Sequence, residues 1–61
     1  MAKRRSPRLT REMAATIKWL VAKEGLLQHQ AAARFGINQG RVSEVMRGKR
    51  FPGIPPAMIL S

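Results

Sequence analysis

The sequence has no cysteine and a single histidine, His29, in 61 residues. A domain of this length buries only a small apolar core and often relies on disulfides or a bound zinc ion for stability. A disulfide is impossible here, and one histidine cannot supply the four ligands of a structural zinc site. The fold must therefore rest on apolar packing alone, for which a hydrophobic share of 44% is sufficient. The same length excludes a large enzyme fold.

The spacing of apolar residues predicts a first helix over residues 10–24. Thr10 is a favourable N-cap, Glu12 places negative charge in the first turn, and Gly25 provides a C-terminal stop. The apolar side chains of this helix fall within about 120° on a helical wheel, the width of a stripe that faces a core. They are Met13, Ala14, Ile17, Leu20 and Val21.

Two shorter helices are predicted over residues 28–35 and 39–47. The first consists mostly of strong helix formers and stops at Gly36, and the second begins after the N-cap Asn38 and ends before Gly48. Isolated helices of this length are marginal in water, so both must be held by packing. The predicted fold is all-α: a three-helix bundle over residues 10–50 with a core that includes Ala31, Ala32, Phe35, Val42, Val45 and Met46.

Two short helices joined by a three-residue turn that begins with glycine are typical of a helix-turn-helix. With Gln28 as the first position of the unit, a small residue, Ala32, stands where the helices cross, and Gly36 stands where the turn requires a positive φ. The unit resembles the helix-turn-helix of bacterial and phage DNA-binding proteins, including repressors of the lambda type. Any three-helix bundle could show such residues, but that alternative does not explain the formal charge of +9. The apolar positions of the resemblance are Ala31, Phe35, Ile37, Val42 and Val45.

The resemblance implies that the helix over 39–47 lies in the major groove of DNA and reads bases. Gln39 matches a residue that pairs with adenine, and Gln28 matches one that binds phosphate and braces that reader. For Gln39 and Ser43 the alternative is a solvated face. For Glu44 the alternative is an ion pair with Arg41 or Arg47 on the helix surface. The predicted base-reading residues are Gln39, Gly40, Ser43, Glu44 and Arg47.

Residues 1–9 form a basic arm ahead of the first helix, which we expect to be flexible. The stretch Arg5-Ser6-Pro7-Arg8 is similar to the Gly-Arg-Pro-Arg arm of Hin-type recombinase DNA-binding domains, and this similarity implies insertion into the minor groove. The alternative is a merely solvating tail. The predicted phosphate and minor-groove contacts are Lys3, Arg4, Arg5, Arg8, Gln28, Arg34, Asn38, Arg41, Lys49 and Arg50.

Residues 51–61 form an apolar tail that contains three of the four prolines. Trp19, with Ala15 and Ala22, leaves a second apolar patch on the outer side of the first helix. Either the tail folds back and covers Trp19, or the tail or patch meets a second protomer or another protein. The predicted contact residues, for a homodimer or a partner protein, are Trp19, Phe51 and Ile54.

These observations predict sequence-specific binding of double-stranded DNA by a small bacterial or phage transcriptional regulator. The alternatives are a DNA-binding accessory factor for recombination or transposition, and a protein-binding adaptor that uses the Trp19 patch and the tail. No catalysis, cofactor, metal or small-molecule substrate is expected, because the three carboxylates, Glu12, Glu24 and Glu44, show no metal-ligand or acid/base spacing. We expect a cytoplasmic, nucleoid-associated protein, since the chain has neither a membrane-spanning stretch nor a signal peptide.

Overall fold

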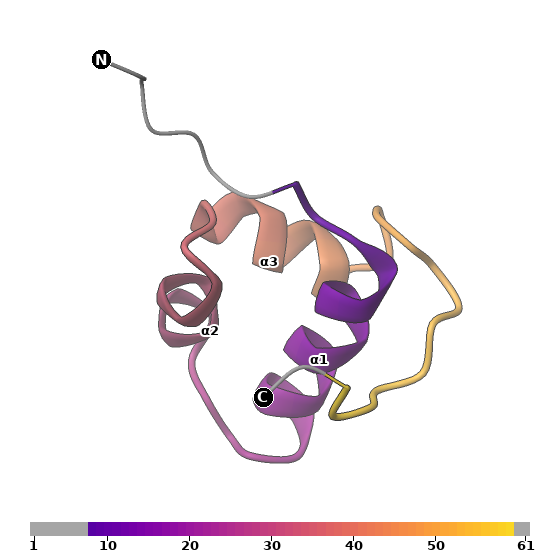
Figure 1. Cartoon of the computed structure of the whole chain (residues 1–61), viewed down its shortest axis with the longest axis horizontal. Coiled ribbons are helices and arrows are strands. Elements are labelled where there is room, and N and C mark those ends of the chain that lie inside the picture. The colour runs from indigo at the N-terminus through magenta and orange to yellow at the C-terminus, as the bar shows by residue number, and fades with distance from the viewer. Residues whose placement is uncertain (1–7, 60–61) are drawn as a thin grey trace.

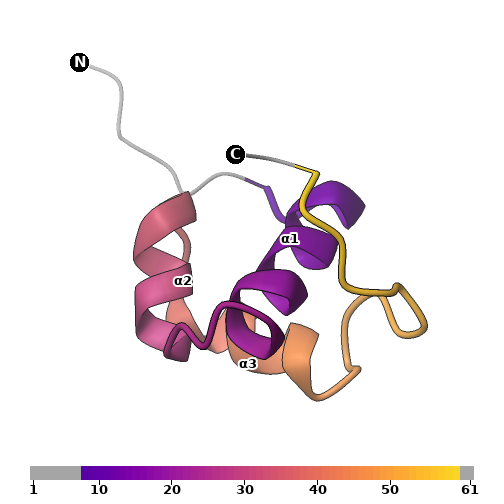
Figure 2. The ribbon, with the colours of Figure 1, turned by 90° about the horizontal axis from the view of Figure 1, so that it is seen from below.

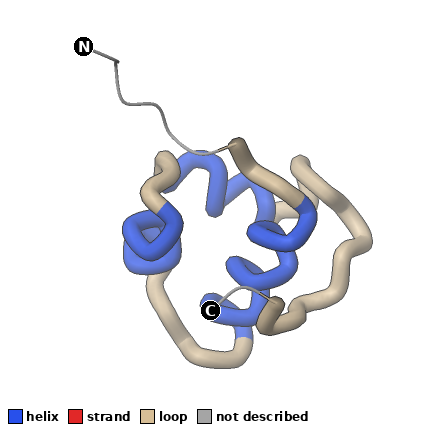
Figure 3. Tube along the Cα trace, in the orientation of Figure 1, coloured by secondary structure: helices blue, strands red, loops and turns tan. Residues whose placement is uncertain are grey.

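The structure is a computed structural model, which describes residues 8–59 of the 61-residue chain. Over this range the chain forms three helices and no strand, as Figure 3 shows. The helices are α1 (Arg11–Ala22), α2 (Gln28–Phe35) and α3 (Gln39–Met46). The prediction of an all-helical chain with three helices is confirmed, and α2 has the predicted bounds. Within the predicted arm, Lys3, Arg4 and Arg5 lie outside the described residues.

Helix α1 begins at the predicted cap but ends earlier than predicted. The Thr10 Oγ1 accepts a hydrogen bond from the backbone N–H of Met13 at 3.1 Å, which satisfies one of the free donors of the first turn. At the other end, the N–H groups of Lys23 and Glu24 both donate to the carbonyl of Trp19, at 2.7 and 3.2 Å. The chain therefore turns at Lys23, and the predicted end at residue 24 is wrong by two residues.

A tight turn of residues 36–38 joins α2 to α3. Gly36 has φ 68° and ψ 31°, a left-handed conformation that a side chain would strain. The N–H of Ile37 then donates to the carbonyl of Ala32 at 3.0 Å, the long hydrogen bond of a Schellman motif. The Asn38 side chain caps α3 by accepting from the N–H of Gly40 at 2.7 Å. The turn thus ends one helix and starts the next within three residues.

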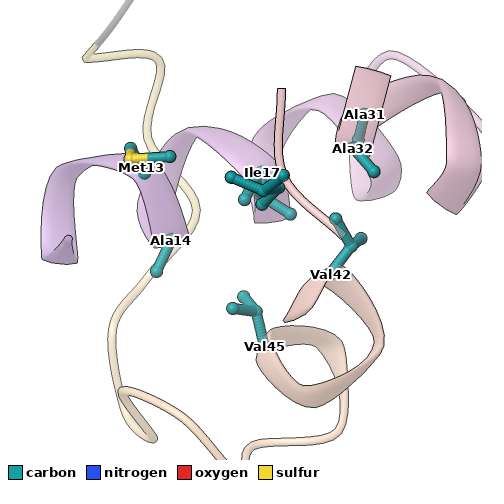
Figure 4. Close-up of a cluster of buried hydrophobic side chains, with 8 residues drawn as sticks. Met13, Ala14, Ile17, Ala31, Ala32, Val42 and Val45 are labelled. Atoms are coloured by element: carbon teal, nitrogen blue, oxygen red, sulfur yellow. The ribbon is translucent and has the colours of Figure 1, made fainter. Parts of the chain in front are cut away.

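The core lies where all three helices meet, and Figure 4 shows Ile17 of α1 between the alanines of α2 and the valines of α3. The side chains of Ile17, Val42 and Val45 are fully buried. Partly buried side chains surround this cluster, among them Leu9, Phe35 and Phe51. The core is small because alanine supplies much of it, as expected where short helices approach closely. Its buried members are Met13, Ala14, Ile17, Ala31, Ala32, Ile37, Val42 and Val45.

The described part of the tail, residues 51–59, has no helix or strand and runs back beside α1, as both ribbon views show (Figures 1 and 2). Three hydrogen bonds attach it. The N–H of Ala57 donates to the carbonyl of Ala15 at 3.1 Å, and that of Ile59 donates to Thr16 Oγ1 at 3.3 Å. The Lys18 Nζ donates to the carbonyl of Ile54 at 2.7 Å.

The tail changes the burial pattern of α1. Residues 13–17 are all buried, which a helix that faces a core on one side only cannot achieve. The predicted outer patch is divided as a result: Ala15 is buried, Trp19 is half-buried and Ala22 is exposed. The tail folds back, but its hydrogen bonds are to Ala15, Thr16 and Lys18, whereas Trp19 donates to Glu24 Oε2 at 3.4 Å.

None of the helices within residues 8–59 is both long enough and apolar enough to cross a membrane.

Candidate nucleic-acid interface

Helix α3 has a buried side and an exposed side with different chemistry. Val42 and Val45 are fully buried against α1 and α2. At 100° per residue, Gly40 and Arg47 lie opposite these two valines, with Ser43 on one flank and Glu44 on the other. Gly40 and Arg47 are exposed, and Ser43 and Glu44 are half-buried. The exposed side therefore presents small and polar groups along the whole helix.

The N-terminal end of α3 is rigidly defined by its cap. Asn38 Oδ1 holds the N–H of Gly40, and Gln39 between them is exposed. A Cβ added at Gly40 would lie 3.1 Å from Asn38 Oδ1, a crowded distance. Glycine at this position therefore fits the cap and also leaves the helix backbone uncovered. The Gln39 side chain stands beside an open stretch of backbone at the end of the helix.

Positive charge is concentrated around α3. Between residues 34 and 50 there are five cationic side chains and one carboxylate, that of Glu44. All five cations are exposed: Arg34, Arg41, Arg47, Lys49 and Arg50. Such a cluster on a small domain creates a local positive potential that attracts polyanions. The helix thus combines polar groups on its exposed side with cations at its edge and its end.

Glu44 binds two of these cations. Its Oε1 accepts from Arg50 Nε at 2.8 Å and from Arg41 Nη1 at 3.3 Å. The hydrogen bond from Arg50 lowers the pKa of the Glu44 carboxyl below its ordinary value; burial opposes this, and the charges of both arginines add to it. The pair with Arg41 is one of the alternatives that the sequence left open. The bond from Arg50 was not predicted, because it depends on how the chain turns after the helix.

The chain after α3 is folded back onto the same residue. Gly48 has φ 78°, and the N–H of Lys49 donates to the carbonyl of Glu44 at 2.8 Å, which again forms a Schellman motif. This turn directs Lys49 and Arg50 toward Glu44, and together with Phe51 these residues line an open hollow of about 330 Å³. The basic end of α3 is therefore shaped by backbone hydrogen bonds as well as by ion pairs.

The remaining predicted contact residues lie on other elements. Gln28 is half-buried at the start of α2, Arg34 is exposed in its last turn, and Arg8 is exposed ahead of α1. Of the predicted partner contacts, Trp19 is half-buried, Phe51 packs against the core, and Ile54 lines a separate hollow of about 310 Å³ beside α1. Sequence reasoning missed Thr16, whose buried hydroxyl joins α1 to the tail. Its place inside a helix gave no sign of that role.

Among residues 8–59 no three His, Cys, Asp or Glu side chains come together in a way that could hold a metal ion. The arrangement around α3 is suited to binding an anionic polymer. It offers exposed cations for phosphate groups and amide, hydroxyl and guanidinium groups for hydrogen bonds. Comparison with known proteins gives no match for this chain among protein families, curated proteins or solved structures.

Proposed function

We propose that this chain is a sequence-specific double-stranded DNA-binding protein in which α2 and α3 act as a helix-turn-helix. The observation that carries the proposal is the division of α3 into two sides. Val42 and Val45 close the core, and the opposite side is polar and bordered by exposed cations. An α-helix with such a side fits the major groove of B-DNA, where each base pair presents its own pattern of donors and acceptors.

Base reading is assigned to the exposed side of α3. Gln39 can make two hydrogen bonds to an adenine, because its amide offers a donor and an acceptor side by side. Gly40 allows the helix backbone to approach the bases, and Arg47 reaches a guanine or a phosphate. Ser43 lies between them, on the flank opposite Glu44.

Affinity is assigned to the cations and to the arm. Arg34, Lys49 and Arg50 are exposed and can pair with phosphates, which supplies binding energy without sequence information. The arm residues of the sequence prediction, from Lys3 to Arg8, would add contacts in the neighbouring minor groove. A protein bound in this way at a promoter blocks or recruits polymerase without catalysis of its own, which is the action of a small transcriptional regulator.

Selection of bound fragments from random duplex DNA, followed by the variant Gln39→Ala, tests this proposal. Gln39→Ala should weaken binding to the selected sequence by about 1–3 kcal/mol and leave binding to scrambled duplex unchanged. His29→Ala, at an exposed position on α2, is the matched control and should change binding to neither the selected nor the scrambled duplex. If Gln39→Ala weakens both duplexes equally, Gln39 does not read bases and the proposed reading side is wrong.

A further inference from the structure

Glu44 occupies an unexpected position for an acidic residue on a surface that attracts phosphate. It lies on the exposed half of α3, next to the polar groups assigned to base reading, and a carboxylate there repels DNA. Yet its Oε1 holds two cations of the same surface, Arg41 at 3.3 Å and Arg50 at 2.8 Å. All three side chains remain accessible, with exposed fractions between 37% and 49%.

The geometry makes these ion pairs direct competitors of phosphate. A guanidinium that donates to a carboxylate must release it, at least in part, before the same N–H groups can donate to a phosphate oxygen. Lys49 and Arg50 are also held by the carbonyl of Glu44, which accepts from their N–H groups at 2.8 and 3.4 Å. These bonds keep the backbone of Arg50 close to Glu44, within reach of its carboxylate.

We infer that Glu44 restrains binding to random DNA by holding Arg41 and Arg50 in the free protein, so that Glu44 acts as a specificity residue. This inference rests on the proposed function. On random duplex the phosphates must displace the carboxylate from both arginines with no compensating contact. On the correct sequence the released carboxylate can accept from a cytosine amine, which offsets the loss. Glu44 thus lowers the affinity for random duplex more than the affinity for the correct sequence.

Binding of a random-sequence duplex, measured by fluorescence anisotropy across salt concentrations, tests the inference. Glu44→Gln and Glu44→Ala should bind the random duplex about tenfold more tightly than the unchanged protein at about 0.1 M salt. The slope of log K against log salt should become steeper by about 1 to 2, because two cations become available to phosphates. Glu44→Ala removes the acceptor altogether and preserves helix propensity.

Two controls separate this effect from a general change of charge. Glu12→Gln makes the same change in net charge in the first turn of α1, at an exposed carboxylate that holds neither Arg41 nor Arg50. It should raise random affinity by less than about twofold, since salt screens an exposed charge that lies outside the proposed interface. In a protein carrying Arg41→Gln and Arg50→Gln, Glu44→Gln should raise random affinity by less than about twofold, because only the direct repulsion between the carboxylate and DNA is then relieved. Circular dichroism of each variant confirms that the helices are retained.

The outcomes are distinct. Equal gains for Glu44→Gln and Glu12→Gln, or a gain that stays near tenfold without the two arginines, would overturn the inference while the proposed DNA binding stands. Absence of duplex binding by the unchanged protein at any salt concentration would remove the proposed function and the inference together. A gain specific to Glu44 that depends on Arg41 and Arg50 is the result that the structure predicts.

Discussion

Single residues set where the helices of this protein begin, end and turn. Thr10 and Asn38 accept hydrogen bonds from the first turns of α1 and α3, and Gly36 adopts the left-handed conformation between α2 and α3. These three positions could be predicted from the sequence because the hydrogen bonds and the φ angle involved are local. Local chemistry of this kind does not depend on the rest of the fold.

Gly36 offers the sharpest test at this scale. Gly36→Ala should destabilise the protein by about 1–2 kcal/mol, because φ 68° brings a Cβ against its own backbone. Gly36→Asn should reduce the stability less than Gly36→Ala does, since asparagine adopts this left-handed conformation more readily than alanine. Urea unfolding followed by circular dichroism measures both. Equal stability of the alanine variant and the unchanged protein would mean that the turn is not held in this conformation.

Other residues were not predictable because their roles depend on distant segments. Thr16 is fully buried and its hydroxyl accepts from Ile59, 43 positions away. Phe51 has φ 52°, an uncommon value for a bulky residue, and packs against the core where the chain turns back after α3. The pairing of Arg50 with Glu44 follows from the same turn. Helical periodicity carries no information on contacts of this range.

The tail is the element that departs most from a simple three-helix plan. Its backbone donates to Ala15 and Thr16, and its Ile54 carbonyl accepts from Lys18, so it covers a side of α1 that would otherwise face solvent. The sequence left two possibilities for the apolar tail: folding back onto Trp19, or contact with a second protomer or another protein. The sequence could not indicate which tail residues lie beside which residues of α1, because this depends on where the backbone groups of the two segments meet.

A chain that ends at Arg50 should therefore be less stable than the full chain by at least about 2 kcal/mol. The loss comprises the three hydrogen bonds that attach the tail to α1 and the burial of apolar surface on α1 and of Phe51. Urea unfolding should show a lower midpoint. Sedimentation of both chains measures their oligomeric state separately. If the tail packs only within its own chain, the full chain should sediment as a monomer. An unchanged midpoint would mean that the tail contributes no packing.

At the scale of the whole molecule, a small alanine-rich core supports a charge of +9. No disulfide can stabilise the chain, and the strong excess of positive charge destabilises the folded state through self-repulsion. An anionic partner relieves that repulsion, so a bound duplex should raise the folding stability of the chain by mass action. Composition alone predicted that the charge favours an anion, and the sequence placed five cations in and beside the third helix. That all five are exposed required the structure.

Titration of duplex binding against salt tests DNA binding by the whole chain most directly. If about 6 phosphates are neutralised, log K should fall with log salt at a slope near −5, and a slope steeper than −3 is expected in any case. The measurement uses the full chain and a duplex selected from random DNA, with binding followed by fluorescence anisotropy. A slope steeper than −3 is the predicted result, and an affinity that does not change with salt would contradict the proposed interface.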